Sequence, residues 1–239
     1  MFKQRALSAG FSLIELTIVL VVVGLMLQAS VSPLGHRIEH KRRLSASDQL
    51  ALVHQHLKAY WVTHARLPCP VHQTRPSGIS LGENNECGQA TGGLPANLLG
   101  IVGPVNSAGA LLDPWSKPLM YSVSLSDIDA AENPNSPDWL TPDTLSTLNF
   151  TNLVADLSVC RDALAGTCSR TSEAAADIVA VVVSSGLNET DREQDNRDGD
   201  QRFISAPYST AEEYAFDDQL IWLGRSELIY LALQVGWLP

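Results

Sequence analysis

The sequence predicts an α+β fold in which a long N-terminal helix packs on a small antiparallel sheet. The helix is indicated by an apolar run over residues 16–27 and by apolar residues at helical spacing as far as His64, with Pro68 as a stop. The sheet is indicated by three apolar segments of strand length that begin at residue 119. The 239 residues suit one moderate domain with an appendage, or two small domains.

The first part of this helix has the composition of a membrane span. Residues 16–27 carry no charge, and the apolar stretch continues with few interruptions to Leu34. A helix from Phe11 to Leu34 would rise about 36 Å, more than the roughly 30 Å of a bilayer's hydrocarbon core. The alternative is a secretory signal peptide, because Ser30 and Ser32 on either side of Val31 give the small-x-small pattern of a cleavage site. The length of the run and an acid near its start, Glu15, favour a transmembrane helix.

Glu15 is the informative residue of the run, because a carboxylate in hydrocarbon costs on the order of 3 kcal/mol. The positions one helical turn ahead hold Ile18 and Val19, so no basic residue of the same helix can pair with it. We therefore expect its cationic partner to be an N-terminal amine or a group of another chain.

The N-terminus resembles the cleavage motif of type IV prepilins and type II secretion pseudopilins. A short leader with Lys3 and Arg5 ends at Gly10, and the sequence FSLIEL follows. The resemblance implies that a prepilin peptidase cuts after Gly10 and methylates the amine of Phe11. It also implies that Glu15 meets the N-terminal amine of a neighbouring subunit, where each buried charge reduces the desolvation cost of the other. A plain uncleaved anchor with a tolerated acid is the alternative.

The resemblance and the helical pattern divide the chain into four parts. These are a leader peptide at 1–10, a transmembrane and assembly helix at 11–34, the amphipathic half of the stalk helix at 35–66, and a globular periplasmic head at 67–239. The protein is then expected in the inner membrane, as a single-pass protein with a periplasmic head, and later in an extracellular filament or pseudopilus.

The basic cluster at residues 37–43 argues for the opposite orientation, because cytoplasmic flanks usually carry the excess of Lys and Arg. We follow the cleavage motif, which is more specific than that statistical rule.

The head is predicted to contain three strands and a final helix, which gives a pilin-like fold. The strands lie at residues 119–125, 177–185 and 219–224, and the second is apolar throughout, as a central strand would be. Leucines at helical spacing predict a helix over residues 226–235. Residues 67–118 are rich in Gly, Pro and Asn, which indicates loop with short elements.

The chain has four cysteines and no CxxC pair, which weakens a thioredoxin-like or zinc-ribbon interpretation. Three pairings into disulfides are open, and free buried thiols are the alternative. The local pairing closes two short loops, and a location outside the cytoplasm would favour disulfides. That pairing joins Cys69 to Cys87 and Cys160 to Cys168.

A second segment resembles the major pseudopilin of type II secretion. The triplet Asp113-Pro114-Trp115, followed by Tyr121, is similar to that family's DPWG…Y segment. In the family a later acidic loop binds calcium, and the corresponding region here is 185–218. Oxygen ligands in a flexible loop suit calcium, although the spacing does not fit an EF-hand, and a solvated acidic loop is the alternative. The candidate calcium ligands are Asp195, Asp198, Asp200 and Asp217.

The formal net charge of −10 disfavours a nucleic-acid partner. The sequence contains no Walker or HExxH motif and no Cys paired with a positioned His, and no enzyme is predicted. We expect a structural subunit, a minor pilin or pseudopilin of a bacterial type IV pilus or type II secretion filament. Its expected partners are prepilin peptidase, other pilin or pseudopilin subunits and the inner membrane. The alternative is a non-polymerising, membrane-anchored periplasmic protein that binds a ligand or calcium.

Overall fold

The computed structural model divides the chain into two compact units, residues 1–42 and residues 43–239. Inside helix α1 the side chains of residues 27–34 are not described. The predicted boundaries at residues 10, 34 and 66 remain predictions. The structure describes residues 12–72, 87, 89–127, 137–141, 153–161, 172–188, 194, 196–211 and 215–237.

Helix α1 (Leu13–His64) belongs to both units. It ends at His64 because Ala65 has a φ of 56°, the left-handed conformation that commonly terminates helices. In residues 43–64 its buried side chains recur every three or four positions, which is the pattern of a helix with one face in a core. These side chains are Ala46, Leu50, Val53, Leu57, Tyr60 and Trp61.

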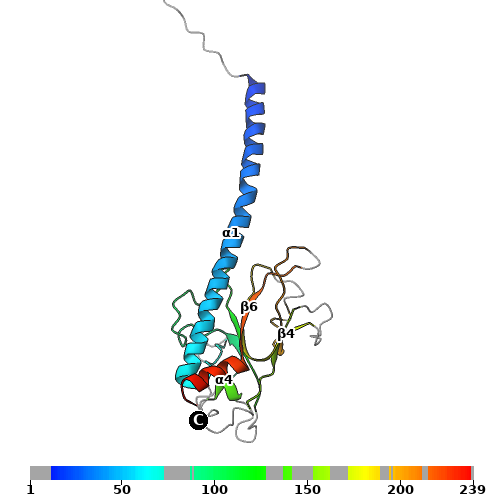
Figure 1. The fold of residues 1–239 in the computed structure, drawn as a ribbon. Coiled ribbons are helices and arrows are strands. Elements are labelled where there is room, and N and C mark those ends of the chain that lie inside the picture. Colours follow the sequence, from blue (N-terminus) through cyan, green and yellow to red (C-terminus); the bar gives the residue numbers. More distant parts are fainter. Residues whose placement is uncertain are drawn as a thin grey trace, which may run out of the picture. The chain divides into compact units, whose positions relative to one another are not determined.

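A six-stranded sheet forms the rest of the core of residues 43–239, and Figure 1 shows it beside the C-terminal part of α1. Its order is β1-β2-β4-β3-β5, and β6 also pairs with β4. The strands are β1 (Thr91–Gly93), β2 (Met120–Val123), β3 (Leu157–Cys160), β4 (Glu173–Ser184), β5 (Arg202–Ile204) and β6 (Gln219–Gly224).

Strand β4 is the centre of the sheet. Its 12 residues pair antiparallel with β2, β3 and β6, and every residue from Ile178 to Ser184 is buried. The predicted strands at 119–125, 177–185 and 219–224 correspond to β2, β4 and β6. The predicted final helix corresponds to α4 (Arg225–Gln234).

The predicted fold class is nevertheless wrong. The sheet is a curled sheet of six strands rather than a small antiparallel one, and β3 and β5 run parallel. Among the described side chains of α1, those buried in the core lie in residues 46–61. Over residues 13–26 of the same helix the large apolar side chains are exposed.

The predicted transmembrane helix at residues 11–34 and the single-pass inner-membrane location are also contradicted. Within the described parts of the chain, no helix combines the length and the apolar character that crossing a membrane requires.

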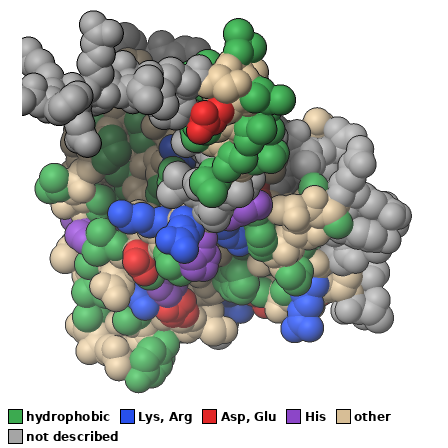
Figure 2. Space-filling view, turned by 90° about the horizontal axis from the view of Figure 1, so that it is seen from above, with side chains coloured by type: hydrophobic (Ala, Val, Ile, Leu, Met, Phe, Trp, Pro, Cys, Tyr) green, Lys and Arg blue, Asp and Glu red, His purple; other side chains and the backbone are tan. Residues whose placement is uncertain are grey.

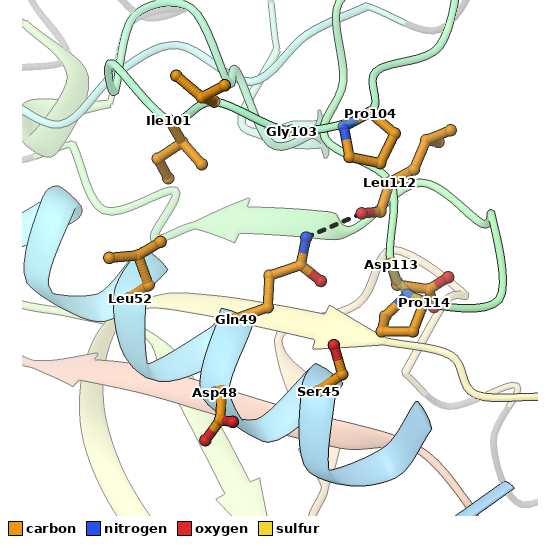
Figure 3. A pocket seen from close by; sticks show the side chains of 11 residues that line it. Ser45, Asp48, Gln49, Leu52, Ile101, Gly103, Pro104, Leu112, Asp113 and Pro114 are labelled. Carbon is orange, nitrogen blue, oxygen red and sulfur yellow. Dashed lines mark hydrogen bonds between the residues drawn. The ribbon is translucent and has the colours of Figure 1, made fainter. Parts of the chain in front are cut away.

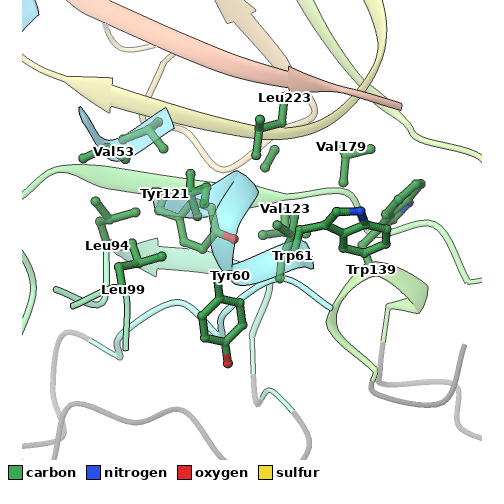
Figure 4. Packing of buried hydrophobic residues seen from close by; sticks show 14 of the residues in the cluster. Val53, Tyr60, Trp61, Leu94, Leu99, Tyr121, Val123, Trp139, Val179 and Leu223 are labelled. Atoms are coloured by element: carbon green, nitrogen blue, oxygen red, sulfur yellow. The ribbon is translucent and has the colours of Figure 1, made fainter. Parts of the chain in front are cut away.

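Aromatic side chains join α1 to the rest of the core (Figure 4). The Trp61 ring lies 5.5 Å from the Trp139 ring, measured between centroids. Both indole N–H groups donate hydrogen bonds to backbone carbonyls, that of Trp61 to Leu228 at 3.0 Å and that of Trp139 to Val154 at 2.8 Å. Buried indoles need such partners, so the Trp61 bond fixes α4 to α1, and the Trp139 bond fixes the segment before β3 to Trp139.

An ion pair on the surface adds to the contact between α4 and α1. The Lys58 ammonium lies 3.1 Å from a carboxylate oxygen of Glu227, and His54 Nε2 lies 3.5 Å from the other oxygen. The pair is partly exposed, so it contributes little to stability but records that the two side chains are neighbours.

A disulfide closes the loop after α1. Cys69 and Cys87 are bonded, with Cα atoms 5.3 Å apart, and this confirms the predicted pair. Cys160 is also disulfide-bonded, while Cys168 lies outside the described residues.

Tyr121 of β2 places a phenol at the centre of the core (Figure 4). Its side chain has no exposed surface, and its hydroxyl has no hydrogen-bond partner among the described residues. Burial, together with the nearby Tyr60, raises the pKa of Tyr121 well above its usual value. An unpaired buried hydroxyl costs stability, because it leaves its hydrogen bonds with water unreplaced.

We predict that Tyr121→Phe raises the free energy of unfolding by about 1 kcal/mol at neutral pH. In the wild type the unfolded chain ionises Tyr121 as the pH rises past about 10, while the folded chain keeps it neutral, so stability falls there. The variant should lose less stability between pH 9 and 11. Urea unfolding at several pH values measures both effects. Tyr230→Phe, at an exposed position, is the control. Destabilisation by Tyr121→Phe would show that the hydroxyl has a partner.

Candidate functional site

The most unusual surface among the described residues is the start of α1. Over residues 13–26, every large apolar side chain is between 43 and 82% exposed. Globular proteins rarely leave a contiguous apolar surface of this kind in water, and such surfaces usually mark a binding site. The side chains are Leu13, Ile14, Leu16, Ile18, Val19, Leu20, Val21, Val22, Val23, Leu25 and Met26.

These side chains surround the helix instead of forming one stripe. Residues 18–23 are six consecutive apolar residues, and successive residues are turned by about 100°, so they cover every direction around the axis. One partner helix could cover only one side. The surface therefore suits a bundle of several helices.

Glu15 is the one charged residue in this stretch, and its side chain is exposed. Its carboxylate has no hydrogen bond or ion pair with any described residue, whereas its backbone amide donates to the carbonyl of Ser12 at 3.0 Å. Burial of the surrounding apolar surface would also bury this carboxylate, so whatever covers the helix must supply a cation or hydrogen-bond donors. Gly10 and Phe11, the predicted processing site, lie outside the described residues.

The Asp113-Pro114-Trp115 segment forms a tight turn, and the Asp113 side chain holds it together. The carboxylate is buried, and one oxygen accepts hydrogen bonds from the amides of Trp115 and Lys117, each at 2.9 Å. The other oxygen accepts the Ser184 hydroxyl of β4 at 2.8 Å. This segment therefore fixes the loop before β2 to the central strand, a structural role.

The described carboxylates among the predicted calcium ligands accept hydrogen bonds from backbone amides. The Asp198 carboxylate accepts the amide of Asp200, and the Asp200 carboxylate binds the amide and guanidinium of Arg202. Asp217, which is buried, accepts the amides of Leu187 and Asn188 at 2.9 and 3.0 Å.

In the part of the chain that the structure describes, no three His, Cys, Asp or Glu side chains gather as a metal site. Asp195 lies outside that part, so calcium binding stays an untested prediction.

A cleft of about 400 Å³ lies between α1 and the loop at residues 101–114 (Figure 3). Gln49 spans it and donates a hydrogen bond to the carbonyl of Leu112 at 2.9 Å. Two carboxylates line the cleft, those of Asp48 and Asp113. The Asp113 carboxylate accepts the hydrogen bonds of the turn, and Asp48 is exposed. The lining offers no paired acid and base for a chemical step.

Comparison of the chain with protein-family models, with curated proteins and with solved structures gives no match. The functional argument therefore depends on the residues of this chain.

We predict that Asp113→Ala lowers the free energy of unfolding by about 3 kcal/mol or more, because it leaves two amides and a buried hydroxyl without their charged acceptor. Urea unfolding measures the change. Asp48→Ala, which removes an exposed acid at the mouth of the same cleft, should change stability by less than about 0.5 kcal/mol. Equal effects of the two substitutions would contradict the assigned role of Asp113.

Proposed function

We propose that this protein is a structural subunit of a filament, a minor pilin or pseudopilin of a bacterial type IV pilus or type II secretion system. The observation that carries the proposal is the exposed apolar surface of residues 13–26. Assembly with helices of the same kind would remove this surface from water.

The gain from covering this surface is large compared with the stability of a domain. Full burial of one Val, Leu or Ile side chain contributes about 1.5–3 kcal/mol. Eleven such side chains, Met included, are exposed here, so even partial burial against several neighbours outweighs the entropy lost on association. Because apolar residues face all directions, each helix needs several neighbours, which favours a polymer over a dimer.

Glu15 would then set the register between neighbouring helices. A carboxylate buried among apolar helices is stable only opposite a cation, and in the prepilin resemblance that cation is the amine of Phe11 on the next subunit. This pairing needs a free N-terminus at Phe11, so cleavage after Gly10 would precede assembly.

The alternative function, a non-polymerising protein that binds a ligand, has no comparable support. The cleft beside Gln49 is open and mostly apolar, and the acidic residues described in 196–218 are used in local hydrogen bonds. Neither feature accounts for the apolar surface of α1.

We predict that co-production with a prepilin peptidase shortens the chain by residues 1–10. Intact-mass measurement and N-terminal sequencing should find a methylated Phe11. The Gly10→Val variant should keep residues 1–10, because the prepilin resemblance places Gly10 directly before the cut. A mature N-terminus at Val31, the product of a signal peptidase, or at Met1 would refute the proposal.

We predict that Glu15→Gln reduces incorporation into sheared filaments by at least tenfold, since the neutral amide cannot pair with the amine. Asp48→Asn removes an exposed acid further along the same helix and should leave incorporation unchanged. Quantitative immunoblotting of sheared and cell-bound fractions gives the measurement. Equal incorporation of the Glu15→Gln variant and the wild type would contradict the role of Glu15.

A further inference from the structure

The part of α1 that follows the apolar surface is a cationic surface. Residues 36–42 contain three basic residues and two histidines, all exposed, with Glu39 as the one acid. None of Arg37, Lys41 and Arg42 forms an ion pair with any described residue of the range 12–42. Figure 2 shows Lys, Arg and His side chains gathered on the face turned to the viewer. We call residues 36–42 the basic segment.

The basic segment is unfavourable for an isolated helix. Arg37 and Lys41 are one helical turn apart, where like charges repel, and Lys41 and Arg42 are adjacent. An anionic partner would remove this repulsion.

The chain itself supplies such a partner. Of its 16 Lys and Arg, five lie in residues 1–42, but of its 26 Asp and Glu only two do. Residues 43–239 therefore carry 11 basic and 24 acidic residues. The basic segment keeps its three basic residues and one acid when residues 1–10 are removed, so it and residues 43–239 are opposite in charge. Opposite charges speed and orient association.

We propose that the basic segment of one copy binds the acidic surface of residues 43–239 of a second copy. The inference rests on the proposed filament, since it names the surface by which one subunit meets the head of the next. The contact is heterologous, because the two surfaces differ, so it can repeat from subunit to subunit and build an open polymer. A second copy is favoured over anionic lipid because the matching charge is present at equal concentration in every subunit.

Carbodiimide cross-linking of a mixture of ¹⁵N-labelled and unlabelled full-length chains tests the contact. A neutral detergent covers the apolar surface and leaves the basic segment accessible. We expect mixed-isotope cross-links between Lys41 and acids of residues 43–239. The Lys58–Glu227 pair, at 3.1 Å within one chain, is the internal control and should give single-isotope cross-links. Absence of mixed-isotope cross-links at Lys41, when the control pair is cross-linked, would overturn the proposal.

Charge reversal gives a second test by sedimentation equilibrium in the same detergent. Reversal of Arg37, Lys41 and Arg42 to Glu should weaken self-association at least tenfold at 50 mM salt, and the difference should shrink at 500 mM salt. The matched control reverses Lys58, Arg161 and Arg202 to Glu, which changes the net charge equally but makes the head more acidic. It should leave association equal or stronger. Weakening by both sets would overturn the proposal.

Two outcomes separate this inference from the proposed function. Mixed-isotope cross-links at Lys41 in a chain that is never cut at Phe11 would support the contact and refute the prepilin assignment. Cutting before Phe11 without cross-links at Lys41 would support the prepilin assignment and refute the contact. Binding of the basic segment to vesicles of phosphatidylserine, with no self-association at low salt, would assign it to lipid and refute the contact.

Discussion

The apolar surface at the start of α1 is the constraint on which the account depends. Residues 13–26 expose large aliphatic side chains in every direction, and one carboxylate, Glu15, lies among them. Exposure of the aliphatic side chains to water is unfavourable, and burial of the Glu15 carboxylate in an apolar environment is also unfavourable. Only an environment that is apolar and also contains a cation satisfies both. Helices of other subunits, with a free N-terminal amine among them, are such an environment.

The rest of the molecule shows how a globular domain is attached to such a helix. The buried stripe of α1 in residues 46–61 packs against the sheet, and the Trp61 indole bonds to the first turn of α4. Strand β4 holds the sheet together, because three other strands pair with it. Asp113 ties the preceding loop to β4 through Ser184. These residues hold the core together, whereas the contacts proposed between subunits involve residues 13–26 and 36–42.

The elements with strong periodicity could be predicted from the sequence. Strand β4 was evident from its apolar run, and the stripe from Leu50 to Trp61 from its helical spacing. Strand β1 was missed because Gly92 and Gly93 have low strand propensity, and they are needed there since a Cβ on Gly93 would collide with Ala110. The parallel pairing of β3 with β5 was missed because short strands carry no signal for their partners.

The site was predictable in part. The role of Glu15 stays a prediction, and it comes from a conflict between its charge and its apolar neighbours that is visible in the sequence itself. The structural use of Asp113 was missed because hydrogen bonds to distant residues such as Ser184 depend on the fold.

The most direct test of the central claim is photo-cross-linking from the apolar surface in cells that assemble the filament. Benzoylphenylalanine at position 19, where the native valine is 53% exposed, should give adducts with the N-terminal helix of a second copy or of another filament subunit, identified by mass spectrometry. The same probe at position 55, exposed on the part of α1 beside the core, should not give these adducts. Adducts of position 19 with lipid alone, or no adducts, would contradict assembly through this helix.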